Sequence, residues 1–184
     1  FGRDKTSVGW LTPGIASPSA RRLKDHVLGA EIMLFDFDGP SPGTGVAQSI
    51  IDAMFAEIDR LGLAYFAATT YSHTIKSAPG CARFRLGLRP SRRISTIPDW
   101  DACWQHWADL WMSLGAEPDH ATRHWASCFY GPSLPEGSEG KAWRRIVAGD
   151  SFDVDAIVSR STSRTKTVAR AREALRAAPG ERPA

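Results

Sequence analysis

The 184-residue chain is long enough for one globular domain with a tail, and its 42% of hydrophobic residues, with seven Trp and eight Phe, exclude a wholly disordered protein. No apolar run approaches the roughly 20 residues that a membrane-spanning helix needs, so we expect no membrane partner. Cys81, Cys103 and Cys128 are odd in number and widely spaced. This pattern is typical of free thiols in a reducing compartment, and we expect the protein to be cytoplasmic.

The formal net charge of +3 is concentrated near the carboxyl end of the chain. Between Arg160 and Ala184, seven basic residues outnumber two acidic ones and give this segment a charge of +5, so that residues 1–159 carry about −2. A generally basic surface, of the kind that attracts nucleic acid, is therefore not indicated for the body of the protein. Any anion-binding site there has to come from local clustering of basic side chains.

The first predicted strand and helix follow a polar N-terminal stretch. Residues 1–30 are punctuated by Pro, Gly and Ser and show no periodicity, which predicts a small irregular N-terminal unit. The apolar run Glu31–Phe37 predicts a buried strand, and the breaker run Gly39–Gly43 ends it. Val46–Leu61 then places apolar side chains on one helical stripe, and Gly62 predicts the end of that helix.

Two further strands, a second helix and a last strand complete the predicted order. Leu63–Thr70 is apolar and predicts a strand, and Ala82–Arg89 alternates charged and apolar residues, which predicts a strand with one polar face. Pro98 opens a helix that Gly115 ends, and Trp125–Tyr130 predicts the fourth strand. The apolar stripe of the second helix consists of Trp100, Cys103, Trp104, Trp107, Leu110, Trp111 and Leu114. At helical spacing we interpret this stripe as core packing rather than as a stacking platform for bases.

The element order β-α-β-β-α-β predicts an α/β (α+β) fold with a core like that of the RNA-recognition motif. In that topology the first and third strands lie side by side at the centre of the sheet. Residues two apart on a strand share a face, so Asp36 and Asp38 would project beside Arg83 and Arg85 from the face away from the helices. Cross-strand salt bridges on a solvated sheet face are the alternative explanation of the same four residues.

These four residue types suit phosphate chemistry. Two carboxylates two residues apart on one strand can share a pair of divalent ions, which phosphoryl and nucleotidyl transfer require. Hard oxygen ligands favour Mg²⁺ or Mn²⁺ over zinc. A guanidinium group binds two phosphate oxygens at once, so Arg83 and Arg85 suit a triphosphate. The sequence therefore predicts a two-metal site at Asp36 and Asp38 beside a triphosphate site.

Further polar residues are expected near this face. His73 follows the second strand, which should pair with the third, so we expect it to hold phosphate or sugar. Asp119 comes immediately before the predicted fourth strand, which would flank the first. Asp119 is therefore the candidate third carboxylate, with Glu117 as the fallback. Arg123, which we expect in the segment that enters this strand, is a candidate for another phosphate contact.

In this order, the motifs resemble those of the archaeo-eukaryotic primase superfamily, in its phage- and plasmid-encoded primase or primase–polymerase branch. Leu34–Gly39 (LFDFDG) resembles the family's motif of a hydrophobic run and Asp-x-Asp. Thr69–Thr74 (TTYSHT) with Ala82–Arg85 (ARFR) resembles its second motif, and Gly115–Asp119 (GAEPD) resembles the segment of the third acid. The resemblance covers roughly residues 10–158.

The resemblance implies a DNA primase or primase–polymerase domain with an RNA-recognition-like catalytic core, which carries out metal-dependent, template-directed nucleotidyl transfer. It implies two Mg²⁺ or Mn²⁺ ions as cofactors, and a single-stranded DNA template and dNTP or NTP as partners. Residues 1–158 would form the catalytic domain, and residues 159–184 a basic tail or linker toward a C-terminal helicase or initiator region. The implied metal ligands and catalytic residues are Asp36, Asp38 and Asp119, and the implied nucleotide-binding residues are Ser72, His73, Arg83, Arg85 and Arg123.

Two other functions stay open. Phe35–Gly39 is also how a haloacid-dehalogenase-like phosphatase begins, with Asp36 as the nucleophile and Asp38 as the acid or base. Against this function, Pro40 replaces the expected Thr, and the predicted order lacks the repeating βα units of a parallel sheet. The third alternative is a non-catalytic DNA-binding initiator module that keeps the fold for recognition.

Overall fold

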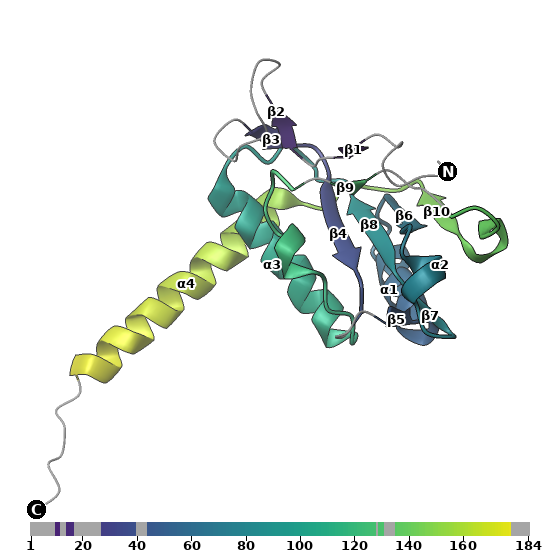
Figure 1. Ribbon diagram of the computed structural model, residues 1–184. Coiled ribbons are helices and arrows are strands. Elements are labelled where there is room, and N and C mark those ends of the chain that lie inside the picture. Colours follow the sequence, from purple (N-terminus) through teal and green to yellow (C-terminus); the bar gives the residue numbers. More distant parts are fainter. Residues whose placement is uncertain are drawn as a thin grey trace, which may run out of the picture.

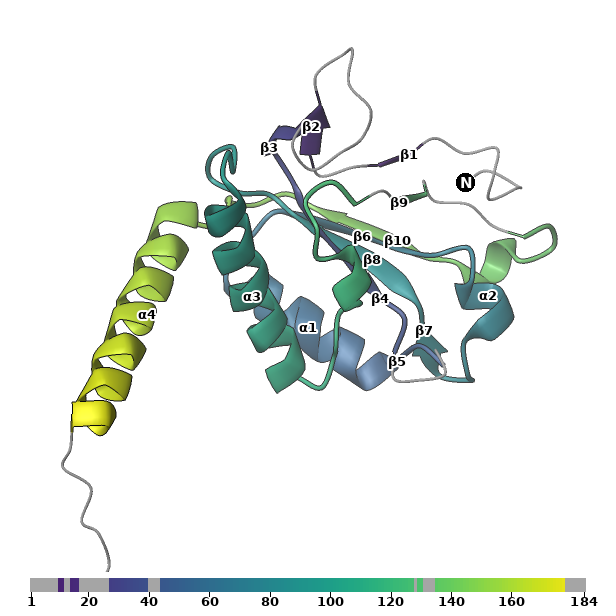
Figure 2. The ribbon, with the colours of Figure 1, turned by 60° about the vertical axis from the view of Figure 1, so that its left-hand side comes forward.

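The protein is built on a four-stranded antiparallel sheet that two helices cover on one face (Figure 1, Figure 2). The computed structural model describes residues 10–11, 14–16, 27–39, 44–127, 129–130 and 135–177. The sheet consists of β4 (Met33–Phe37), β6 (Tyr65–Thr69), β8 (Phe84–Leu88) and β10 (Arg144–Val147). The helices are α1 (Gln48–Arg60), α2 (His73–Lys76), α3 (Ile97–Ser113) and α4 (Val154–Ala177). The predicted mixed α/β class is confirmed.

The strand order across the sheet is β10-β6-β8-β4, and every pairing in it is antiparallel. The first and third predicted strands, β4 and β8, are therefore neighbours, as expected, and the second, β6, lies on the other side of β8. The expectation that both lie at the centre of the sheet is wrong for β4, which is an edge strand, because the fourth strand pairs with β6 and not with β4. In this register Asp36 lies directly opposite Arg85, and Arg85 lies opposite Ala68 on β6. The charged residues of β4 and β8 thus meet on one face of the sheet.

The opposite face of β4 and β8 packs against the helices. The ring centroid of Phe35 lies 5.9 Å from that of Trp104 on α3. The ring centroid of Phe84 lies 6.2 Å from that of Phe55 on α1. Because side chains alternate along a strand, Asp36, which follows Phe35, projects from the face that α1 and α3 do not cover.

Helix α3 carries the tryptophan stripe into the core. Its N-cap is Thr96, whose Oγ1 accepts a hydrogen bond from the Asp99 N–H at 3.2 Å. The helix ends before Gly115, which has a φ of +90° that favours glycine. Its four tryptophans, Trp100, Trp104, Trp107 and Trp111, are at most 2% exposed. The interpretation of the stripe as core packing is confirmed.

The predicted fourth strand is wrong in both its extent and its partner. Among the described residues of Trp125–Tyr130, the strand β9 spans Phe129–Tyr130, and it pairs with β1 (Trp10–Leu11) rather than with β4. Trp125 and Ala126 are buried in a turn, so their apolar character reflects packing on the core and not strand periodicity. The fourth strand of the sheet is β10, which pairs with β6 at the opposite edge.

The segment before β9 also differs from the prediction. Residues from Asp119 onward were expected to enter a strand, but they form the 3₁₀ turn η2 (His120–Thr122). The Oδ1 atom of Asp119 accepts a hydrogen bond from the Ala121 N–H at 2.9 Å. An acidic residue in this position satisfies a free N–H group at the start of a helical turn, which stabilises the turn over an extended chain.

The N-terminal unit is not irregular throughout. Within it, β2 (Gly14–Ala16) pairs antiparallel with β3 (Val27–Ala30). The pairing of β1 with β9 and the bridge between Ala30 and Ile94 tie parts of residues 1–30 to the body. A separate short ribbon in the body joins β5 (Val46–Ala47) and β7 (Cys81–Ala82). The remaining stretches of the predicted irregular unit, residues 1–9, 12–13 and 17–26, lie outside the described residues.

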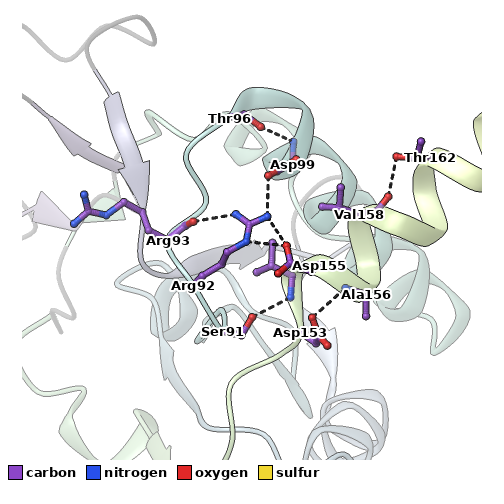
Figure 3. Close-up of polar contacts among 11 residues, drawn as sticks. Ser91, Arg92, Arg93, Thr96, Asp99, Asp153, Asp155, Ala156, Val158 and Thr162 are labelled. Atoms are coloured by element: carbon purple, nitrogen blue, oxygen red, sulfur yellow. Dashed lines mark hydrogen bonds and ion pairs between the residues drawn. The ribbon is translucent and has the colours of Figure 1, made fainter.

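Arg92 joins the first turns of α3 and α4 (Figure 3). Its guanidinium donates to Asp155 Oδ1 at 2.9 Å and to Asp99 Oδ2 at 3.1 Å. Beside it, Ser91 Oγ accepts a hydrogen bond from the Val154 N–H at 3.2 Å, where α4 begins. This network fixes the starts of the two helices relative to each other.

Helix α4 continues the chain through the boundary predicted at residue 158. Its first turns belong to the core, because Val154 is 0% and Ile157 is 4% exposed. Farther along, the helix projects away from the sheet (Figure 1). In the part of the chain that the structure describes, neither α4 nor another helix has the length and apolar character to span a membrane.

Replacing Arg92 with Ala should lower the free energy of unfolding by about 1 kcal/mol, because it removes two partly exposed ion pairs that hold α3 and α4 together. Urea unfolding followed by circular dichroism measures this change. The control is Arg93→Ala, which removes an exposed ion pair with Glu31 and should change the free energy by less than about 0.5 kcal/mol. Equal effects of the two substitutions would contradict a clamp at Arg92.

Candidate active site

Asp36 and Arg85 form an ion pair across β4 and β8. Nε and Nη2 of Arg85 donate to Asp36 Oδ2 at 3.3 and 3.2 Å. The Asp36 side chain is 14% exposed and the Arg85 side chain 16%. The shared face of the two residues was predicted from the alternation of the two strands, and the register brings them directly opposite each other.

Asp38 and Arg83 form a second ion pair beside the first. Arg83 Nε donates to Asp38 Oδ1 at 2.8 Å, and Nη2 contacts Oδ2, so the guanidinium uses both carboxylate oxygens. The Arg83 side chain is nearly buried, whereas that of Asp38 is 39% exposed. Asp38 directly follows β4, and the chain then turns at Gly39 with a φ of +78°. A Cβ at Gly39 would collide with the backbone of Gly45, so this turn requires glycine.

The surroundings of Asp36 raise the pKa of its carboxyl group. Burial raises its pKa above the usual value, Arg85 opposes this shift, and the charges of Asp38 and Asp119 add to it. Among the described residues, its Oδ1 is buried without a hydrogen-bond partner. An unpaired buried carboxylate oxygen is costly, and a bound cation would satisfy it.

Asp119 lies beside the first strand, although it does so from a turn and not from a strand. Its backbone N–H donates to the Asp36 carbonyl oxygen at 2.8 Å. Its side chain caps η2 through the Ala121 N–H, and its charge contributes to the raised pKa of Asp36. Asp119, the third predicted carboxylate, is therefore close to Asp36, and its Oδ1 already accepts a hydrogen bond from the Ala121 N–H. Glu117, the predicted fallback, lies 3.5 Å from His120 Nε2 through its Oε1.

His73 connects three parts of the structure at the edge of the site. Its Nε2 lies 3.0 Å from the Lys141 carbonyl oxygen, which can only accept, so we assign the ring proton to Nε2. Nδ1 then accepts hydrogen bonds from the Ser77 hydroxyl at 3.0 Å and from the Arg83 backbone N–H at 3.4 Å. Burial lowers the pKa of His73, and the ring is held neutral in this network. Because both ring nitrogens bond to protein atoms, His73 positions the chain at Arg83.

The two remaining predicted residues, Ser72 and Arg123, lie in different parts of the structure. Ser72 directly precedes α2, and its carbonyl oxygen accepts hydrogen bonds from the first turn of that helix. Arg123 lies against α3, where its Nε is 3.3 Å from Asp101 Oδ1 and its guanidinium is 5.3 Å from the ring centroid of Trp104. A pocket of about 470 Å³ adjoins it, lined by Ile97, Trp100, Asp101, His120, Ala121, Arg123, His124 and Trp125. The described side-chain contacts of Arg123 thus connect it to α3 and not to Asp36 or Asp38.

Three residues of the site were not predicted. The ring centroid of Phe129 lies 5.3 Å from the Arg85 guanidinium, so β9 covers part of the charged face (Figure 2). Phe129 belonged to a predicted strand, but its place over Arg85 follows from the pairing of β9 with β1. Ser77 and Lys141 hold the ring of His73. Lys141 contacts His73 through its backbone carbonyl, which every residue type has, so the sequence could not predict this contact.

The donor set fits a divalent cation at two carboxylates. Asp36 and Asp38 offer hard oxygen ligands on one face, and the buried Oδ1 of Asp36 has no partner in the described ranges. Within those ranges, no group of three or more His, Cys, Asp or Glu side chains could hold a metal ion. The arrangement therefore provides two carboxylates with Asp119 nearby, and not a closed cage of three ligands.

Comparisons of this chain with protein-family models, with curated proteins and with solved structures find no match. The chemistry assigned to the site therefore rests on its own residues and their geometry.

Protonation of His73 should cost stability as the pH falls. Its pKa in the folded protein lies below the ordinary value of 6.5, so the unfolded state takes up the proton first. The stability contributed by the neutral ring is therefore present above pH 6.5 and is lost as the pH falls through the folded pKa. Urea unfolding at several pH values between about 5 and 8 measures this slope, and His73→Gln should reduce it.

The control for this experiment is His106→Gln. Burial also lowers the pKa of His106, so the slope of the wild-type protein contains both contributions. The His106→Gln variant should keep the part of the pH dependence of stability that comes from His73. A slope unchanged in His73→Gln and abolished in His106→Gln would contradict the hydrogen-bond assignment.

Proposed function

We propose that this protein is a metal-dependent nucleotidyltransferase, the catalytic domain of a DNA primase or primase–polymerase of phage or plasmid replication. It adds dNTP or NTP opposite a single-stranded DNA template. One observation carries the proposal: the carboxylates of Asp36 and Asp38 each face an arginine on the same sheet face, and one buried oxygen of Asp36 has no partner among the described residues. The proposed metal ligands, Asp36 and Asp38, thus lie next to the proposed phosphate-binding arginines.

Each residue has a distinct role in this proposal. Asp36 and Asp38 would hold Mg²⁺ or Mn²⁺, with Asp119 as the additional carboxylate. When bound, two such ions activate a 3′-hydroxyl and stabilise the leaving pyrophosphate. The forks of Arg83 and Arg85 bind the triphosphate oxygens and orient the α-phosphate.

The residues around this centre have supporting roles. His73 holds the backbone of Arg83 and so positions a phosphate-binding guanidinium. Ser72, one residue earlier, is proposed to contact the sugar or phosphate. Arg123 joins the nucleotide only by giving up its ion pair with Asp101.

The phosphatase alternative has less support. Its first strand belongs to a parallel sheet, whereas β4 pairs antiparallel with β8 in a sheet whose pairings are all antiparallel. A non-catalytic DNA-binding module would have no use for a buried carboxylate oxygen on β4 that has no partner among the described residues. Both observations favour the nucleotidyltransferase.

The basic C-terminal segment is proposed to connect the catalytic domain to a helicase or initiator region. Residues 159–184 carry the positive charge of the chain, and α4 begins in the core and projects from it (Figure 1). This charge suits contact with DNA phosphates. We propose the cytoplasm as the site of action, in keeping with free thiols at Cys81 and Cys103.

Replacing Asp36 or Asp38 with Asn should reduce metal-dependent incorporation at least about 100-fold, because each change removes a charged metal ligand and keeps the size of the side chain. Extension of a labelled primer on a single-stranded template, with Mn²⁺ and dNTP, measures the effect. Asp52→Asn on the exposed surface of α1 is the matched control and should keep full activity. Circular dichroism checks that the variants fold, and full activity in either site variant would remove the central claim.

Arg85→Ala should weaken nucleotide affinity more than Asp119→Asn does, by about tenfold or more, because Arg85 supplies a phosphate fork and Asp119 a metal ligand. Titration of nucleotide at a fixed, saturating metal concentration measures both affinities. The reverse order would mean that the phosphate and metal roles are exchanged between these two residues.

A further inference from the structure

The pocket of about 470 Å³ between the first turns of α3 and the turn η2 is formed by other residues than the charged face of β4 and β8. Its volume lies within the range of roughly 300–1,000 Å³ that is usual for pockets that hold small molecules. The buried indole rings of Trp100 and Trp125 line it, together with Ile97, an apolar residue that is 42% exposed. These three residues form an apolar wall, which suits a flat ring.

Hydrogen-bond donors line the same pocket. The Arg123 side chain is 39% exposed, and its guanidinium is held by Asp101 and by the ring of Trp104, whose centroid is 5.3 Å away. The Nδ1 atom of His124 accepts a hydrogen bond from the Ala126 N–H at 3.2 Å, so we assign the ring proton to Nε2. Guanidinium and imidazole N–H groups bind phosphate oxygens. The pocket therefore combines an apolar wall with donors for one anionic group.

The polar residues of the pocket do not suit a metal ion. His120, His124 and Asp101 line it together with Arg123, whose guanidinium would repel a cation. Within the described ranges, moreover, no group of three or more His, Cys, Asp or Glu side chains could hold a metal. An anion that carries a flat ring fits this lining better than a cation does.

The turn η2 connects this pocket to the candidate active site. The Asp119 N–H donates to the Asp36 carbonyl oxygen at 2.8 Å, and the next residue along the chain, His120, lines the pocket. His120 is also packed against the core, because its ring centroid lies 5.2 Å from that of Trp104. A DNA strand at the aspartates therefore has the pocket one short turn away.

We propose that the pocket holds one nucleotide of a single strand of DNA. The base packs on the apolar wall, and the phosphate accepts hydrogen bonds from the Arg123 guanidinium and from His124 Nε2. The choice of DNA rests on the proposed function, which requires a template strand, and the pocket adds a place where that strand is held. Arg123 acts here from its observed position, whereas contact with the incoming triphosphate would require it to leave Asp101.

Fluorine NMR of the protein labelled with 5-fluorotryptophan locates the bound strand without turnover. The chain has seven Trp, and the variants Trp100→Phe and Trp125→Phe assign the two signals of the pocket. Trp107, which packs on Phe152 with ring centroids 5.6 Å apart, is the internal control. Titration with a short oligothymidylate should shift the signals of Trp100 and Trp125 in a saturable way and leave that of Trp107 unchanged. Absence of a shift at both pocket positions would overturn the proposal.

Variants of the charged residues test how the strand is held. Arg123→Gln should weaken oligothymidylate binding at least about fivefold, because it removes the guanidinium. Asp101→Asn should tighten it about threefold, because a negative charge leaves the pocket while Trp104 still holds the guanidinium. Arg60→Gln is the matched control, since it breaks an exposed ion pair with Glu57 on α1 and should keep the wild-type affinity. Equal affinities of Arg123→Gln and Arg60→Gln would contradict the phosphate contact.

Smaller probes distinguish a DNA strand from other ligands with the same chemistry. dTMP and inorganic phosphate are titrated in the same way, with the same two signals as the readout. Oligothymidylate should bind at least about tenfold more tightly than either, because a strand makes further contacts beside the pocket. Equal affinities of dTMP and oligothymidylate would overturn the assignment to a strand in favour of a free nucleotide.

The pocket and the proposed function fail separately. Shifts at Trp100 and Trp125 without primer extension would support the pocket and contradict nucleotidyl transfer. Primer extension with both signals unmoved by DNA would support transfer and overturn the pocket. If circular dichroism shows that Arg123→Gln is unfolded, Asp101→Asn and His124→Gln decide the question. Tighter binding in the first and weaker binding in the second support the proposal, and wild-type affinity in both overturns it.

Discussion

The antiparallel register of β4 on β8 is the constraint on which the rest of the structure depends. It sets Asp36 opposite Arg85 and Phe35 opposite Leu86, so that one face of the pair is charged and the other apolar. A slip by one residue would turn Phe35 and Phe37 away from the helices and press carboxylates against the tryptophans of α3. The aromatic core therefore fixes the register, and the register fixes the charged face.

That charged face adds little to stability. Buried ion pairs lose about as much in desolvation as they gain in attraction, and one Asp36 oxygen lacks a partner in the described part of the chain. The cross-strand salt bridges of the simpler alternative do exist, but the pair of Asp36 and Arg85 is largely shielded from water: Phe129 lies over Arg85, and Asp36 is 14% exposed. Partly buried charges that the core has to offset are typical of sites that bind ligands.

The sequence predicted the elements whose burial leaves a periodic signal. Three strands, two helices and the shared face of Asp36 and Asp38 follow from apolar spacing and glycine stops. The fourth strand was predicted wrongly because Trp125 and Ala126 are apolar through packing in a turn. By contrast, three of the four residues of β10 are exposed, so this strand shows no alternation. Its position comes from backbone pairing with β6, which any residue can provide.

The unpredicted strand β10 also explains why His73 lies where it does, a feature that residue types in the sequence could not reveal. The pairing of β10 with β6 extends by one more hydrogen bond, from the Thr69 N–H to the Trp143 carbonyl oxygen at 3.1 Å. This pairing places the preceding turn η3 (Glu139–Lys141) beside α2. There the Lys141 carbonyl accepts from His73, and His73 in turn accepts from the Arg83 N–H. Arg83 is therefore held at its backbone by a chain of contacts that starts from an edge strand.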